Sequence, residues 1–129
     1  MVKLMRYAKH ITRKMLRERP NTLFVFGDNM VHRGLGGQAK EMRGEHNAVG
    51  IPTKLLPGMD CTDFFRDEDY DRAKPKIDAA FVKLFAHAAN GGEVVWPKDG
   101  IGTGLAELPK RAPKIWKLIE ENRIALERA

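Results

Sequence analysis

The chain has 129 residues, of which 43% are hydrophobic, and its formal net charge is +6. A chain of this size can bury one substantial core, so we expect a single globular domain over residues 1–129. Its single cysteine, Cys61, excludes an internal disulfide and a cysteine-based zinc site. Residues 1–15 are too charged for a secretory signal, and no apolar run could span a bilayer, so we expect a cytoplasmic protein without membrane contact.

The positive charge is concentrated at the N-terminus. Residues 1–20 hold seven basic residues against Glu18 alone, which gives +6, and the other sixteen basic and sixteen acidic residues cancel. We therefore expect a basic strand and helix extension over residues 1–20, ahead of a core over residues 21–129. Such a segment either attracts nucleic acid or forms an ordinary solvated helix face. Its basic residues are Lys3, Arg6, Lys9, Arg13, Lys14, Arg17 and Arg19.

The first predicted elements are an edge strand within residues 2–7 and a helix over residues 13–19. Thr12 is the expected N-cap of this helix, and Pro20 ends it because the residue before a proline avoids helical geometry. Residues 23–26, Leu-Phe-Val-Phe, form a continuous apolar run. Such a run is typical of a strand that is covered on both faces in a parallel α/β sheet.

A short helix over residues 38–43 and a second strand over residues 47–51 follow. Pro52 is expected to end this strand, because proline cannot donate a ladder hydrogen bond. Residues 54–72 form a long irregular connection, which compact domains seldom contain without a purpose. The Phe64-Phe65 pair within it is either a plug on the core or a stacking surface for a base.

The second half of the chain predicts a helix, a strand and a helix. Apolar residues from Ile77 to Ala88 recur at helical spacing, which makes this the clearest element. Residues 93–96 are the next strand, which Pro97 stops, and a last helix starts at about Leu108. The alternation of strands and helices indicates an α/β domain with a mostly parallel central sheet.

Two of the strands end in glycine-rich turns that are followed by helices. Residues 33–37 form the first turn and residues 98–105 the second. Because the carboxyl ends of parallel strands meet at one sheet edge, the turns should wall one crevice, with backbone donors around a phosphate-containing ligand. Neither turn contains the G-x-x-x-x-G-K-[ST] cradle of triphosphate-binding proteins. The alternative is that the glycines serve only tight turns.

Polar residues accompany the first turn. Asp28 and Asn29 follow the apolar strand directly, at the sheet edge where open α/β sheets bind ligands. His32 has an intrinsic pKa suited to proton transfer. Asp28 could instead cap a turn through a side-chain bond to the backbone. The other histidines show no ligand spacing, so we predict no metal and no cofactor.

At these residues the chain resembles the macro domain family of ADP-ribose-binding modules, in a short divergent form such as is found in bacteria and phages. The resemblance covers roughly residues 23–122. Residues 26–29 are similar to the asparagine-bearing strand end of that family, and residues 34–39 to the loop beside the distal ribose. Residues 100–104 are similar to the loop that wraps the pyrophosphate. The family's usual Asn-Ala-Ala-Asn stretch is absent.

The resemblance implies a three-layer α/β/α sandwich that binds ADP-ribose or an ADP-ribosylated macromolecule. It implies that Asn29 bonds a ribose hydroxyl and that Asp28 orients the ligand or activates a water. Hydrolysis of an ADP-ribosyl linkage, dephosphorylation of ADP-ribose 1″-phosphate and binding without catalysis stay open as alternatives. The candidate catalytic residues are Asp28, Asn29 and His32. The candidate ligand-binding residues are Gly27, Gly34, Gly36, Gly37, Gln38, Lys98, Asp99, Gly100, Ile101, Gly102, Thr103 and Gly104.

Overall fold

The computed structural model describes residues 5–129 and contains a four-stranded sheet in which every neighbouring pair is parallel. The strands are β1 (Met5–Ala8), β2 (Leu23–Asn29), β3 (Ala48–Lys54) and β4 (Val94–Pro97). The helices are α1 (Arg13–Glu18), α2 (Ala39–Met42), α3 (Tyr70–Ala89), α4 (Leu108–Arg111) and α5 (Pro113–Glu127). The strand order is β1-β4-β2-β3. The α/β class and the parallel sheet expected from the sequence are thereby confirmed.

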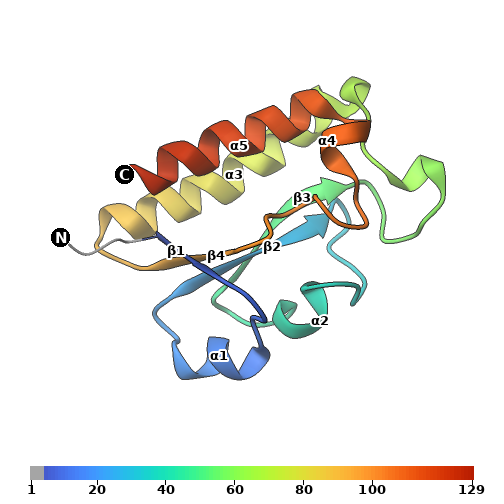
Figure 1. The fold of residues 1–129 in the computed structure, drawn as a ribbon. Helices are drawn as coiled ribbons and strands as arrows, with labels where there is room; N and C mark the ends of the chain where they lie inside the picture. The colour runs from blue at the N-terminus through green and yellow to red at the C-terminus, as the bar shows by residue number, and fades with distance from the viewer. Residues whose placement is uncertain (1–4) are drawn as a thin grey trace.

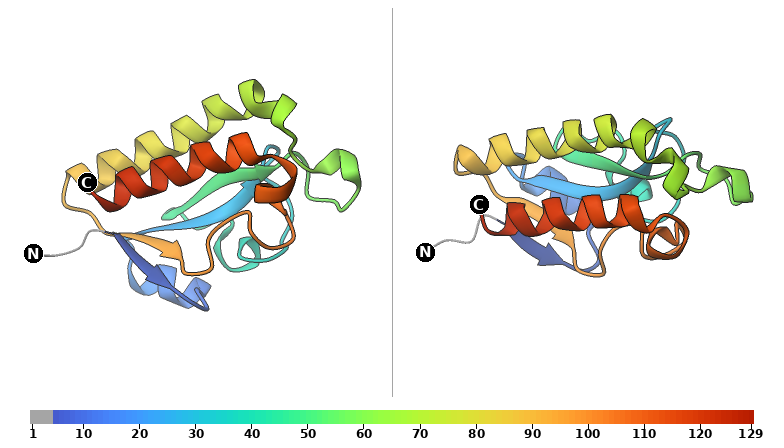
Figure 2. Two further views of the ribbon diagram at one scale, coloured as in Figure 1. Left: turned by 45° about the horizontal axis from the view of Figure 1, so that its top comes forward. Right: turned by 90° about the horizontal axis from the view of Figure 1, so that it is seen from above.

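Helices cover both faces of the sheet. In Figure 1, α3 and α5 lie above the sheet and α1 and α2 lie below it. Figure 2 shows that α3 and α5 lie side by side on one face of the sheet. The apolar run of β2 serves both layers, because Leu23 and Val25 belong to the core cluster under α3 and α5, whereas Phe24 and Phe26 belong to the cluster against α1 and α2.

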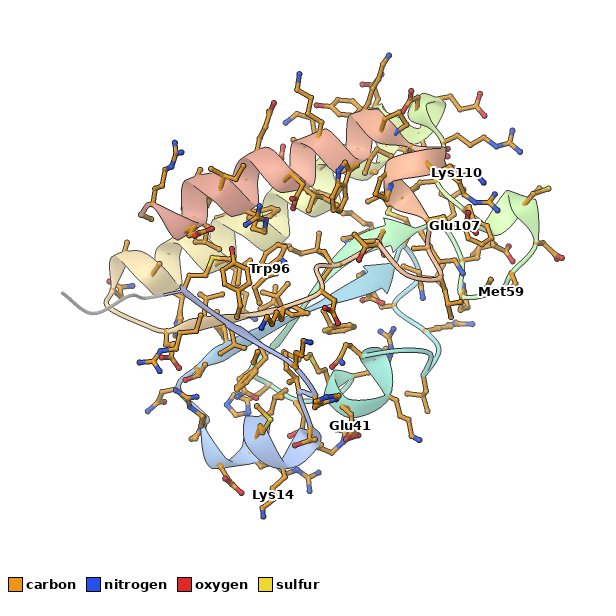
Figure 3. The ribbon with its side chains drawn as sticks, viewed as in Figure 1. Lys14, Glu41, Met59, Trp96, Glu107 and Lys110 are labelled. Atoms are coloured by element: carbon orange, nitrogen blue, oxygen red, sulfur yellow. The ribbon has the colours of Figure 1, made fainter. Side chains whose placement is uncertain are left out.

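The larger cluster lies between the sheet and the long helices. Trp96 of β4 points into this space (Figure 3), where its ring stacks on Phe81 of α3 with the ring centroids 6.1 Å apart. Ile77, Phe81 and Leu84 are buried there, as the periodicity of the sequence predicts. Within residues 5–129, no helix combines the length and the apolar character that crossing a bilayer requires.

The N-terminal segment contributes to the sheet and to the core. β1 pairs with β4 at one edge of the sheet, and the part of the predicted edge strand before Met5 lies outside the described residues. Thr12 caps α1 as predicted, since its hydroxyl accepts a bond from the Met15 N–H at 3.3 Å. Leu16 of α1 is fully buried in the smaller cluster.

The prediction that Pro52 ends its strand is wrong. β3 continues to Lys54, and Pro52 lies opposite Asp28 of β2. β3 is an edge strand, where a missing ladder donor is tolerated. The register shifts directly afterwards, because Asn29 pairs with Lys54 and leaves Thr53 as an extra residue.

Two other expectations are decided by the structure. Phe64 and Phe65 are buried, so the pair is a plug on the core and not a stacking surface for a base. Phe64 forms an antiparallel bridge with Lys54, which folds the long connection back onto the end of β3. The single last helix is in fact two, because α4 ends before Ala112 and Pro113 begins α5 at a position that needs no N–H donor.

Candidate ligand-binding site

A cavity of about 290 Å³ lies at the carboxyl ends of β2, β3 and β4. Residues 33–38, which we call the first glycine loop, follow β2 and form one wall. Residues 98–106, the second glycine loop, follow β4 and form another. Both loops line the same cavity, as their positions after parallel strands predict. The predicted site residues in its lining are Gly27, Asp28, Asn29, Gly34, Gly36, Gly37, Gln38, Gly100, Ile101, Gly102 and Gly104.

Four predicted site residues lie outside this lining. Lys98 and Asp99 are exposed in the turn after β4. Thr103 donates its hydroxyl to the carbonyl of Asp99 at 2.8 Å, which closes that turn. His32 is exposed and contacts the cavity only through Asp28. Within residues 5–129, no three His, Cys, Asp or Glu side chains lie together in a way that could hold a metal ion.

Backbone N–H groups without a backbone partner occur on both walls. In the described part of the chain, no N–H from residues 34–39 or from residues 101–106 donates to a backbone carbonyl. The Oε1 atom of Gln38, at the inner end of the first glycine loop, is also buried without a hydrogen-bond partner. Buried polar groups of folded proteins are normally satisfied, so the Gln38 oxygen indicates space for a polar ligand or for water, and the N–H groups, most of them in exposed residues, are accessible to either.

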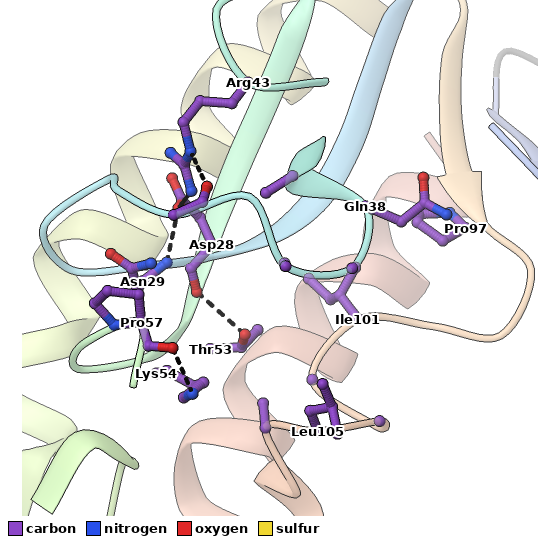
Figure 4. Close-up of a pocket in the computed structure, with 18 of the residues that line it drawn as sticks. Asp28, Asn29, Gln38, Arg43, Thr53, Lys54, Pro57, Pro97, Ile101 and Leu105 are labelled. Carbon is purple, nitrogen blue, oxygen red and sulfur yellow. Dashed lines mark hydrogen bonds and ion pairs between the residues drawn. The ribbon is translucent and has the colours of Figure 1, made fainter. Parts of the chain in front are cut away.

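Asp28 is the most buried charged group of the cavity, with only 3% of its side chain exposed. Its Oδ1 accepts bonds from Arg43 Nη2 at 2.6 Å and from the Asn29 N–H at 2.8 Å, and its Oδ2 lies 2.8 Å from His32 Nδ1. Figure 4 shows the Arg43 side chain directed at Asp28. Burial by itself would raise the pKa of Asp28, but the bonds from Arg43, His32 and the Asn29 N–H outweigh it and lower that pKa.

A glycine on the neighbouring strand makes room for this carboxylate. Asp28 lies on the α2 side of β2, as the alternation after Phe24 and Phe26 requires. A Cβ atom at Gly50 of β3 would lie 2.6 Å from Asp28 Oδ2 and 2.9 Å from Asp28 Cβ. Only glycine at position 50 leaves the carboxylate where Arg43 reaches it.

Asn29 organises the first glycine loop. Its Oδ1 accepts bonds from the N–H groups of Val31 at 3.1 Å and Arg33 at 3.3 Å, and its Nδ2 donates to the Arg33 carbonyl at 2.6 Å. The bond from Val31 is the side-chain turn that the sequence offered as an alternative role for Asp28. Asn29 makes that turn, and the Asp28 carboxylate pairs with Arg43 and contacts His32.

Sequence reasoning missed several residues of the cavity lining, and among them Arg43, Thr53 and Lys54 contact the predicted residues or the adjoining turn. Arg43 follows α2, donates Nε to the Gly34 carbonyl at 2.8 Å, and thereby joins Asp28 to the first glycine loop. Thr53 donates to the Asp28 carbonyl at 3.2 Å, and Lys54 Nζ donates to the carbonyls of the following turn. Thr53 and Lys54 could have been found, because β3 ends at the same edge of the sheet as β2 and β4. The wrong prediction that Pro52 ends β3 placed both residues outside the strand.

The cavity has an excess of positive charge. Arg33, Arg43 and Lys54 line it, and Asp28 is the only acidic residue in its lining within the described residues. Arg33 is exposed and makes no ion pair with any described residue. The field of this arrangement favours an anionic ligand.

The lowered pKa of Asp28 predicts how stability depends on pH. A carboxylate whose pKa is lower in the folded state stabilises the protein above its unfolded pKa of about 3.9, and this contribution is lost as the pH falls through the folded value. We expect the free energy of unfolding to fall more steeply between pH 5 and about pH 2 in the wild type than in Asp28→Asn. Urea unfolding across this range measures both slopes, and equal slopes would contradict the assignment.

The comparisons with known proteins give a family but no function. Residues 6–122 match the model of a family of unknown function (DUF7831), so the chain belongs to that family. Neither a curated protein nor a solved structure matches the chain.

Proposed function

We propose that the cavity binds ADP-ribose or a closely related nucleotide derivative, with its phosphate groups between the two glycine loops. The observation that carries this proposal is the presence of free backbone N–H groups on both walls, over residues 34–39 and 101–106. Glycine-rich backbone presents such groups to phosphate oxygens without a Cβ atom in the way. A ligand that holds two adjacent phosphates could use both walls at once.

The charges support an anionic ligand of this kind. Arg33 is free to pair with a phosphate, while Arg43 and Lys54 add positive potential from the other walls.

Removing Arg33 should therefore weaken binding without loosening the fold. We expect Arg33→Ala to lower the affinity for ADP-ribose roughly three- to tenfold at low salt, with an unchanged melting temperature. Titration at low and high salt tests this, and an unchanged affinity at low salt would remove Arg33 from the site.

The remainder of the ligand has apolar side chains within reach. A volume of about 290 Å³ is near the lower end of the range of small-molecule sites, so a dinucleotide-sized ligand would extend to the mouth. Met59 and Leu105 line the cavity with 60% and 69% of their surface exposed. These side chains would cover part of a base or ribose. A macro-type three-layer α/β/α arrangement, with the ligand at the carboxyl edge of the sheet, belongs to the same proposal.

Binding is better supported than catalysis. Both carboxylate oxygens of Asp28 are engaged and its pKa is lowered, so it is a weak base near neutral pH. One observation favours hydrolysis of an ADP-ribosyl linkage as a second candidate. Asp28 Oδ2 lies 2.8 Å from His32 Nδ1, and an imidazole oriented by a carboxylate in this way can act as a general base through its other nitrogen.

The test is calorimetric titration with ADP-ribose, AMP and inorganic phosphate. We expect ADP-ribose to bind at least about tenfold more tightly than AMP, because AMP lacks the second phosphate and its charge-assisted bonds. No heat of binding at millimolar ADP-ribose, in the range of weak ligands, would overturn the proposal.

Catalysis is decided on the same sample. Wild-type protein and His32→Ala are incubated with an ADP-ribosylated protein and with ADP-ribose 1″-phosphate, and the products are separated by chromatography. Product that forms in the wild type and is lost in the variant would establish the hydrolase. Binding of ADP-ribose by both proteins without product would establish a binding module.

A further inference from the structure

In the basic N-terminal segment, the described residues 5–20 form five ion pairs with acidic residues of the same chain. Two glutamates of the core each pair with two of its arginines, and a fifth ion pair lies within α1. The five basic residues share only three glutamates, so these contacts compensate part of the positive charge of the segment. The pairs are Arg6 and Arg19 with Glu93, Arg13 and Arg17 with Glu45, and Lys14 with Glu18.

Arg13 differs from the other arginines because it also contacts the backbone beside the cavity. Its Nη1 donates to Glu45 Oε2 at 2.6 Å. Its Nη2 donates to the carbonyls of Lys40 and Arg43, each at 3.1 Å. These carbonyls lie at the C-terminal end of α2. The last carbonyls of a helix receive no hydrogen bond from an N–H of the same helix, and a cation beside them is favourable.

The contacts of Arg13 continue into the ligand-binding site through Arg43. The backbone of Arg43 is held by Arg13, and its side chain donates to Asp28 Oδ1 at 2.6 Å and to the Gly34 carbonyl at 2.8 Å. α2 is a single short turn and cannot hold this geometry by helix formation alone. Its orientation therefore depends on contacts with its neighbours.

We propose that Arg13 is a positioning residue for the ligand-binding site: it fixes the C-terminal end of α2, so that Arg43 holds Asp28 and the first glycine loop in the binding geometry. This inference gives the basic N-terminal helix a role in supporting the site. The part of its test that measures affinity for ADP-ribose rests on the proposed function. Arg13 itself does not touch the ligand.

Arg17 is a matched control for Arg13. It lies on the same helix, carries the same charge and pairs with the same glutamate, with Nε 3.3 Å from Glu45 Oε1. Within the described residues it makes no bond to the backbone of α2. An effect of net charge is common to both arginines, whereas the contacts with the carbonyls of α2 are made by Arg13, whose side chain is 30% exposed against 67% for Arg17.

The experiment compares Arg13→Ala, Arg13→Lys and Arg17→Ala with the wild type. We expect Arg13→Ala to lower the affinity for ADP-ribose roughly 3–30-fold, and Arg17→Ala by less than about twofold. Arg13→Lys should recover part of the loss, because an ammonium still reaches one acceptor but cannot span three. Amide hydrogen exchange of residues 34–43 without ligand is the second readout, and it should rise in Arg13→Ala but not in Arg17→Ala.

The two readouts separate this inference from the proposed function. If the wild type binds ADP-ribose and the two alanine variants bind equally well, Arg13 has no positioning role. If the wild type does not bind ADP-ribose, the proposed function fails, and faster exchange confined to Arg13→Ala still supports the positioning role. Equal exchange of residues 34–43 in the two alanine variants would overturn the positioning role. Equal losses of affinity for a labelled single-stranded RNA in both variants, with unchanged exchange of the first glycine loop, would overturn it as well.

Discussion

Replacing Arg43 with methionine is expected to lower the free energy of unfolding by about 3 kcal/mol, because it leaves a buried carboxylate without its main partner. Asp28 is almost fully buried, and Arg43 Nη2 donates to it at 2.6 Å. His32 would remain as a partner, but it is half exposed. For a domain of this size, the loss corresponds to a fall in melting temperature of about 10 °C. Urea and thermal unfolding at pH 7 measure both quantities.

Two further variants determine whether this loss comes from the pair. Lys40→Met removes a charge from exposed α2 surface and should change stability by less than about 0.5 kcal/mol. The double variant Asp28→Asn with Arg43→Met should recover part of the loss, because the buried charge is removed together with its partner. A loss in Arg43→Met no larger than that in Lys40→Met would show that the pair contributes nothing to stability.

Acid should affect Arg43→Met less than the wild type. Without the guanidinium, burial dominates and the pKa of Asp28 rises, so the carboxylate is protonated at a higher pH. Protonation then relieves the buried charge instead of breaking an ion pair. We expect the stability difference between the two proteins to narrow as the pH falls below about 4.

Much of the fold could be predicted, because local patterns determine the elements that are buried most deeply. Residues 23–26 are apolar without alternation, which only a strand with two covered faces requires, and β2 has both faces covered. The spacing from Ile77 to Ala88 likewise identified α3. Pro52 was misread because one sequence does not show whether a strand lies at the edge or in the centre of a sheet, and proline is excluded only from the centre.

The candidate site was predictable where it follows from topology and unpredictable where it follows from tertiary contacts. Two glycine loops after parallel strands must lie at one sheet edge, so their approach could be inferred without coordinates. Arg43 could not be found in this way, because its contact with Asp28 depends on a helix of one turn that returns the chain over β2. The role of Asn29 depends on whether Asp28 or Asn29 turns its side chain towards the loop. Either side chain can accept a hydrogen bond from the backbone of the following turn, so the sequence does not distinguish the two conformations.

Substitution of Gly102 should disturb the geometry of the second glycine loop as much as substitution of Arg43 disturbs the first. Gly102 has a φ of +74°, and a Cβ atom there would lie 3.0 Å from Leu108 Cβ and Cδ2 and 3.2 Å from Thr53 Cγ2. Leu108 is fully buried and cannot move aside cheaply. We expect Gly102→Ala to displace the N–H groups of residues 101–106, to lower ADP-ribose affinity at least about tenfold, and to cost about 1–3 kcal/mol of stability.

Gly91→Ala separates backbone strain from the close approach of side chains. Gly91 also has a positive φ, of +82°, but a Cβ atom there meets nothing within 4 Å, and it lies after α3, outside the cavity lining. This variant should share the cost of the left-handed conformation, about 1 kcal/mol, and keep full affinity for ADP-ribose. Calorimetry and thermal unfolding on both variants give the two effects separately. If Gly102→Ala binds ADP-ribose as tightly as Gly91→Ala, the second glycine loop does not hold the phosphates, and the ligand of this cavity contacts only the β2 side.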